Sequence, residues 1–232
     1  MNKKKILVSV LAVALICAIA IAGTLAFLTA STEEGVVNTF VAAPGLIDPP
    51  QEPAPEDPYD DNGLFVLENE VTLEEDGSYT IADNAELALG NDYTVLPEVN
   101  LPKNPFVRLT GKTTVPAYLY IEVVDTLGED SGLSYEIAEE WVLLENAVGS
   151  NGGDIYVYSD EQGDPVILTA DIGEDVAILV DDQIVVGDTL SIPDGAELSF
   201  YGYLAQASAG EDATSAFGAC FPASDPEPVP QP

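Results

Sequence analysis

The chemistry open to this chain is set by 41 acidic residues and by the complete lack of histidine. Without histidine the chain lacks the usual general base at neutral pH, the usual partner of a serine or cysteine nucleophile, and the commonest zinc ligand. Two carboxylates at a suitable separation would be enough for a glycosidase, but no spacing in the sequence singles out such a pair. We therefore predict that the chain has no catalytic residues and is not an enzyme.

Calcium is the metal ion that best fits this composition, because it takes oxygen ligands only. Asp57, Asp60, Asp61 and Asn62 form one group of oxygen donors, and Asp181-Asp182 forms a second. Neither group has the spacing of an EF-hand loop, so the alternative that both are solvated acidic loops stays open. We predict no cofactor and keep calcium as the one candidate ligand.

The amino terminus has the pattern of an export signal. Lys3, Lys4 and Lys5 precede an apolar run from Ile6 to about Leu28, the usual order of charged and apolar regions in a secretory signal peptide. Small residues at Thr24 and Ala26 predict cleavage after Ala26. The run is also long enough to span a bilayer, so an uncleaved anchor is the alternative. Either way, we expect membrane contact only through this segment.

Loss of residues 1–26 makes the chain more acidic still. Three basic residues (Lys103, Arg108 and Lys112) then remain against the 41 acidic ones, a formal net charge of −38. Such a field repels phosphate backbones, which argues against nucleic-acid binding. The only cysteine beyond the signal is Cys220, which could be a buried small residue or could pair between chains.

Proline and acidic residues divide the rest of the chain. Residues 27–43 form an amino-terminal segment, and residues 44–62 are rich in proline and acid, which is typical of an extended linker. Residues 63–221 contain the apolar runs of a folded domain, and residues 222–232 form a proline-rich tail that we expect to be disordered.

The domain is predicted to be all-β, a jelly-roll-like β-sandwich with one or two short helices. Short runs rich in Val, Ile and Tyr, bounded by Gly, Asp, Asn or Pro, are typical of strands. The predicted strands are Leu64–Leu73, Tyr79–Ile81, Phe106–Thr110, Ala117–Val124, Ile155–Tyr158, Val166–Ala170, Val176–Val180, Gln183–Val186 and Glu197–Ala207. Helical spacing predicts helices at Ser134–Leu144, with Trp141 in the core, and at Glu211–Ala219, with Ala213, Ala216 and Phe217 inward.

Several segments form a characteristic series in order along the chain. They are Gly23–Thr29, Asn38–Val41, Leu96–Val107, Pro116–Val123, Ile155–Tyr158, Tyr201–Ala207 and Ala213–Phe217. Together these segments resemble the TasA/camelysin-like family of secreted Gram-positive proteins, which are exported by a SipW-type signal peptidase. One departure is Glu98, where the family normally has glycine, and another is Phe217, where tryptophan is usual.

The resemblance implies a secreted structural subunit of the cell surface or the biofilm extracellular matrix, processed by a SipW-type peptidase. Its partners would be other copies of itself or other matrix proteins, and fibres would form by strand exchange. The residues expected to make that strand are Phe27, Leu28, Val36, Val37, Phe40 and Val41. The metalloprotease activity described for camelysin is not carried over, because no histidine motif exists here. The alternative is a membrane-tethered monomeric adhesin or calcium-dependent binding module.

Overall fold

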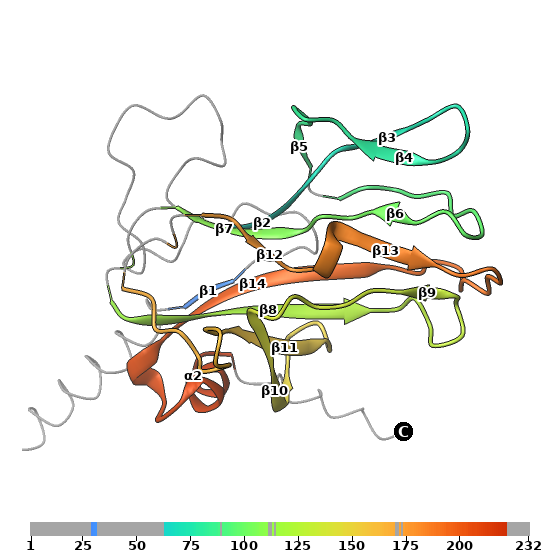
Figure 1. The fold of residues 1–232 in the computed structure, drawn as a ribbon. Coiled ribbons are helices and arrows are strands. Elements are labelled where there is room, and N and C mark those ends of the chain that lie inside the picture. The colour runs from blue at the N-terminus through green and yellow to red at the C-terminus, as the bar shows by residue number, and fades with distance from the viewer. Residues whose placement is uncertain are drawn as a thin grey trace, which may run out of the picture.

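The computed structural model describes residues 63–88, 90–110, 113, 115–169, 172 and 174–221, together with the backbone of residues 29–31. These residues form an all-β, sandwich-like fold with one α-helix, as the sequence predicts. Figure 1 shows the strands lying roughly side by side, with the helix α2 (Ala213–Cys220) below them.

The largest sheet has five strands in antiparallel order. They are β1 (Thr29–Ser31), β14 (Leu198–Gln206), β8 (Ala117–Asp125), β11 (Asp154–Tyr158) and β10 (Trp141–Val148). A second sheet has four strands, β12 (Val176–Ala177), β7 (Phe106–Thr110), β2 (Gly63–Asn69) and β5 (Leu87–Ala88).

Two smaller sheets and two short 3-10 turns complete the described part of the chain. One sheet contains β6 (Leu101–Pro102), β13 (Gln183–Val186) and β9 (Leu133–Ser134), and the other contains β3 (Val71–Leu73) and β4 (Tyr79–Ile81). The turns are η2 (Val180–Asp182) and η3 (Ala207–Ala209).

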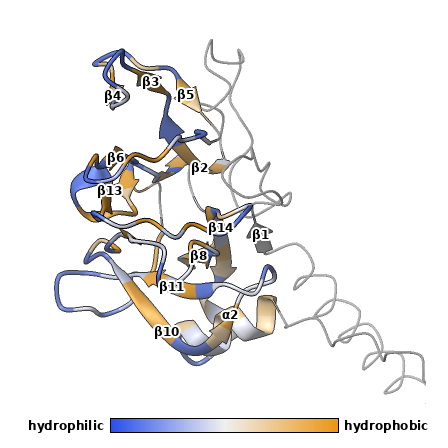
Figure 2. Cartoon of the chain, turned by 90° about the vertical axis from the view of Figure 1, so that its right-hand side faces the viewer, coloured by the Kyte–Doolittle hydropathy of each residue, from blue (hydrophilic) through white to orange (hydrophobic). Residues whose placement is uncertain are grey.

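The central strands of the five-stranded sheet are buried on both faces, which explains why β8 is apolar or aromatic from Ala117 to Val124 except at Glu122. In β8, Leu119, Ile121 and Val123 face a core shared with β2 and β7, while Tyr118 and Tyr120 face a second core that contains α2. Alternate side chains of a strand point to opposite faces, so two buried faces leave no room for an exposed polar series. Figure 2 shows this order of layers, with β2, then β8 and β14, then α2.

Gly202 of β14 lies where the two sheets come closest. A β-carbon at this position would come within 3.1 Å of Val66 Cγ2 and 3.2 Å of Leu64 Cδ2, both on β2. Glycine therefore lets β2 pack directly against β14, which holds the second half of that strand against the first core.

The predicted helix at Ser134–Leu144 is wrong: Leu133–Ser134 forms β9 and Trp141–Val148 forms β10. The spacing that suggested a helix arises because Trp141 and Leu144 enter different cores on the two faces of the sheet. A bulge between Leu143 and Val148, where Asn146 has a φ of 67°, further breaks the two-residue period of the strand. Burial of Trp141 itself is confirmed.

Most of the other predicted elements lie where expected. Strands β4, β7 and β13 match their predicted ranges, and α2 buries Ala213, Ala216 and Phe217. Val166–Ala170 does not form a strand but a single bridge from Leu168 to Ala117, and the strand expected at Val176–Val180 ends at Ala177. Among the described residues there is no helix that is long and apolar enough to cross a membrane.

Candidate functional site

The edge of the five-stranded sheet carries the feature with the clearest functional meaning. There the strand β1 lies antiparallel to the second half of β14, with Thr29 opposite Ala205, Ala30 opposite Leu204 and Ser31 opposite Tyr203. Strand pairing at a sheet edge uses backbone hydrogen bonds, so it accepts many sequences and can join two chains as well as one.

The strand that receives β1 is held firmly on its other side. β14 pairs with β8 over nine consecutive residues, from Leu198 opposite Asp125 to Gln206 opposite Ala117. The side chains of Tyr203, Leu204 and Ala205 are all buried. β14 is thus a pre-organised template, and an incoming strand need not order it.

A buried carboxylate fixes the residue of β14 that lies opposite Ser31. Glu122 of β8 is fully buried, and it accepts a hydrogen bond from the hydroxyl group of Tyr203. The same carboxylate accepts bonds from the backbone N–H groups of Asn151 (2.8 Å) and Gly153 (2.9 Å) and from Asn151 Nδ2 (3.0 Å). Four donors compensate for the cost of burying a charge, so this network ties β14 to β8 and to the turn between β10 and β11.

Two further observations show how closely this network is packed. A β-carbon at Gly149 would collide with the Glu122 carboxylate, so only glycine fits there. Burial, together with the hydrogen bond to Glu122, raises the pKa of Tyr203 well above that of an ordinary tyrosine. Tyr203 therefore remains a neutral donor at physiological pH.

Helix α2 covers this part of the sheet through aromatic contacts. The Tyr203 ring lies 5.7 Å from that of Phe217 and 4.9 Å from that of Phe221, both edge to face. Asp212 begins the helix with a capping box, accepting from the N–H of Ser215 at 2.8 Å while the Ser215 hydroxyl accepts from the Asp212 N–H. The helix is only eight residues long, so its stability depends on this cap and on these rings.

A second buried polar pair lies between β2 and the end of β6. Lys103 Nζ donates to Glu68 Oε2 at 2.8 Å, and both side chains are almost completely buried. The other carboxylate oxygen, Glu68 Oε1, has no hydrogen-bond partner among the described residues. The Lys103 ammonium also lies 5.9 Å from the ring centre of Tyr93 and 6.0 Å from that of Phe200, within range of a cation–π interaction.

The residues predicted for self-association lie outside the described part of the chain. This holds for Phe27, Leu28, Val36, Val37, Phe40 and Val41, and for the predicted cleavage position after Ala26. The structure instead describes three residues from the same predicted segment, Thr29–Ser31, as the edge strand β1.

The two predicted groups of calcium ligands have different outcomes. Asp57, Asp60, Asp61 and Asn62 lie outside the described residues. Asp181 and Asp182 adopt left-handed backbone conformations in η2, with φ of 56° and 49°. Within the described ranges, no group of three or more His, Cys, Asp or Glu side chains is placed to hold a metal ion.

Sequence reasoning did not identify Glu122, Lys103 or Glu68 as buried polar residues. A signal was present, because Glu68 and Glu122 each interrupt an otherwise apolar strand, and a buried charge requires partners. Those partners lie far away in the sequence: Tyr203 is 81 residues from Glu122, and Lys103 is 35 residues from Glu68.

Comparisons of the chain with protein-family models, with curated proteins and with solved structures found no match.

Proposed function

We propose that this protein is a secreted structural subunit of the bacterial cell surface or biofilm matrix, and that subunits join by exchanging the strand that contains Thr29–Ser31. The observation that carries the proposal is the pairing of this short strand with the edge of β14. In an assembly the same strand would occupy the same register on the next subunit, so exchange requires no new type of contact.

The length of the connecting segment supports exchange. Residues 32–62, 31 residues in all, separate β1 from β2, and an extended chain of this length spans up to about 100 Å. Each subunit gives one strand and receives one. Two subunits that swap strands reciprocally would close into a dimer, whereas passing each strand on to the next subunit head to tail produces an open filament, and the proposal is for the second arrangement.

Residue Glu98 provides support for the family resemblance on which the matrix function depends. Glu98 has a φ of 61°, a left-handed conformation that glycine adopts without strain. The resembled family normally has glycine at this position, so the backbone here has the shape that the family sequence would favour.

Electron microscopy and light scattering test the proposal directly. Residues 27–232 are compared with a chain that begins at Asp57 and therefore lacks the exchanged strand. Ala30→Pro in the longer chain removes a backbone donor from β1 and should reduce assembly, whereas Ala54→Pro in the proline-rich linker is the matched control.

Filaments from the longer chain and from Ala54→Pro, with few or none from Ala30→Pro and from the shorter chain, are the expected result. Monomers from every chain would contradict assembly and favour the membrane-tethered binding module instead.

A further inference from the structure

A pocket of about 600 Å³ lies at the opposite end of β14 from the strand-exchange edge. Its residues come from the loop that contains Asp92, from β6, β9 and β13, and from the start of β14. This volume falls within the roughly 300–1,000 Å³ of typical small-molecule sites. The pocket shares no residue with the contacts between β1 and β14, so it can be tested separately from assembly.

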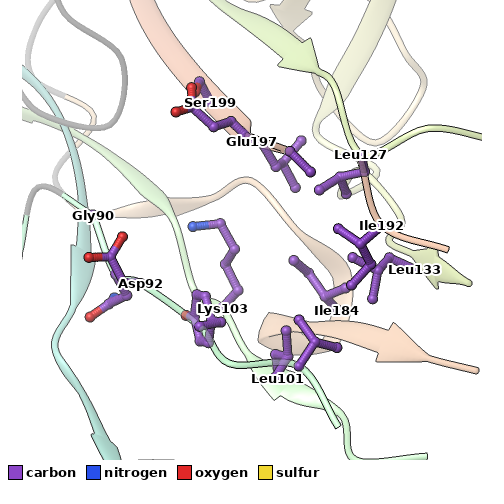
Figure 3. A pocket seen from close by; sticks show the side chains of 15 residues that line it. Gly90, Asp92, Leu101, Lys103, Leu127, Leu133, Ile184, Ile192, Glu197 and Ser199 are labelled. Atoms are coloured by element: carbon purple, nitrogen blue, oxygen red, sulfur yellow. The ribbon is translucent and has the colours of Figure 1, made fainter. Parts of the chain in front are cut away.

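One wall of the pocket is aliphatic and the other is polar. Figure 3 shows the side chains of Leu127, Leu133, Ile184 and Ile192 gathered on one side, with Asp92 on the other and the Lys103 amino group between them. This division suits a molecule that has a hydrocarbon part and a single polar head.

Lys103 supplies the polar contact at the buried end. Its side chain lines the pocket and is 6 % exposed. Its ammonium group has three donors, of which one is bound to Glu68 Oε2. Among the residues that the structure describes, this buried ion pair keeps unused donors and an unpaired oxygen, Glu68 Oε1, and such incompletely satisfied groups in native proteins usually have a reason.

The charges around the pocket decide which kind of polar head group a ligand could carry. Glu68 already neutralises Lys103, and the exposed carboxylates of Asp92 and Glu197 also line the pocket. An anionic head would meet net negative charge, and a cationic head would lie against the Lys103 ammonium, the one cation that lines the pocket. An uncharged head that accepts a hydrogen bond meets neither penalty.

We propose that this pocket binds a small, uncharged amphipathic molecule, whose hydroxyl or carbonyl oxygen accepts a hydrogen bond from Lys103 Nζ and whose hydrocarbon part packs on the aliphatic wall.

Calorimetric titration with three probes of equal chain length tests the head group. The protein, as its cells process it, is titrated with 1-octanol, octanoate and octylammonium. We expect saturable one-to-one binding of 1-octanol, at least about tenfold tighter than either charged probe. Methyl NMR signals of Ile184 and Ile192 should shift with the same saturation curve.

A pocket-filling variant tests the location of the site, and a double variant tests the polar contact from Lys103. Ala196→Trp places a large side chain in the pocket and should weaken 1-octanol binding at least about tenfold, while Ala82→Trp on an exposed turn outside it is the matched control. The double variant Glu68→Leu/Lys103→Met removes the polar group without leaving a buried charge unpaired, and it should also weaken 1-octanol binding about tenfold.

Circular dichroism verifies that each variant is folded before titration. The proposal is overturned if 1-octanol binding is not saturable, if octanoate or octylammonium binds as tightly, or if Ala196→Trp binds 1-octanol as well as Ala82→Trp does. Unchanged binding by the folded double variant would also overturn it, because Lys103 would then not hold the head group.

Discussion

The hydroxyl group of Tyr203 donates a hydrogen bond to the buried carboxylate of Glu122 across the β8–β14 pair. Tyr203 also lies opposite Ser31 in the register of β1. Tyr203 therefore belongs both to the network inside the sheet and to the strand on which β1 lies, so the network holds in place the edge that we propose for strand exchange.

We expect Tyr203→Phe to lower the free energy of unfolding by about 2 kcal/mol, because a hydrogen bond to a charged acceptor is lost. Glu122→Gln should cost about as much or more, since its amide N–H₂ group would face donors. Urea unfolding of both variants and of the double variant measures the coupling between the two residues. Additive effects would contradict the network.

Substitutions of Lys103 and Glu68 should change the free energy of unfolding in a different pattern. Lys103→Met alone leaves a buried carboxylate without a partner and should destabilise the protein by about 3–5 kcal/mol. Glu68→Leu/Lys103→Met removes both charges from the same site and should recover most of that loss. Urea unfolding checks this order of stability, and a double variant less stable than Lys103→Met would show that the ion pair itself is strongly stabilising.

Glu98→Gly should stabilise the protein by about 1 kcal/mol, because it relieves the left-handed backbone conformation of a residue that carries a β-carbon. The backbone N–H of Glu98, which donates to the Gly187 carbonyl at 3.0 Å, is unaffected. Thermal unfolding measures the change. Glu98→Ala serves as the control, because it removes the charge but keeps the strain, and an equal gain from both variants would contradict this reason.

The amino-terminal cap of α2 should make stability depend on pH. Its hydrogen bonds to Ser215 lower the pKa of Asp212, so its contribution is present above the unfolded pKa of about 4 and is lost as pH falls through the lower folded value. Asp212→Ala should therefore lower the melting temperature at about pH 7, and the difference from the wild type should shrink at about pH 2–3.

Asp212→Asn is the control for that effect, because asparagine caps a helix without titrating.

The pH dependence contributed by Asp182 should have the opposite sign, since burial and the nearby Asp181 carboxylate raise its pKa. The charged form of Asp182 therefore lowers the stability of the folded protein at neutral pH, and this stability is regained as the pH falls and the carboxylate is protonated. Asp182→Asn should thus stabilise the protein slightly at about pH 7 and not at acid pH; the gain should be well under about 1 kcal/mol, because the carboxylate is only partly desolvated and solvent screens its charge.

Assembly of residues 27–232 should be faster in salt. Because each subunit has a formal net charge of −38, subunits repel one another. Salt shortens the range of that repulsion from about 30 Å at 0.01 M to about 10 Å at 0.1 M. Mild acid should act in the same direction by neutralising carboxylates. Light scattering over a salt series measures the rate, and equal assembly in low and high salt would contradict this electrostatic control.

The sequence predicts local elements well where one apolar run is bounded by turns. Strands β7 and β13 and the buried face of α2 are examples. The helix predicted for residues 134–144 is wrong, because two different structures can bury both Trp141 and Leu144. A helix would bury them on one face, whereas the bulged strand buries them on its two opposite faces. Only the tertiary fold, with α2 on one side and β2 on the other, separates these two interpretations.

The candidate site depends on contacts that no local pattern contains. Ala30 lies opposite Leu204, and Glu122 is satisfied by Asn151, Gly153 and Tyr203. Proline, lysine and acid patterns predict the ends of the domain, but the edge on which β1 lies is decided by the order of strands in the sheet.

The unequal lengths of the two pairings made by β14 have a mechanical consequence. A load applied along the strands is shared by nine residue pairs between β14 and β8, but by only three between β14 and the described part of β1. Under tension the terminal strand therefore slips before the domain unravels. In the assembly that we propose, a subunit pulled away from its neighbour would therefore stay folded, and the edge of its β14 would remain able to accept another strand.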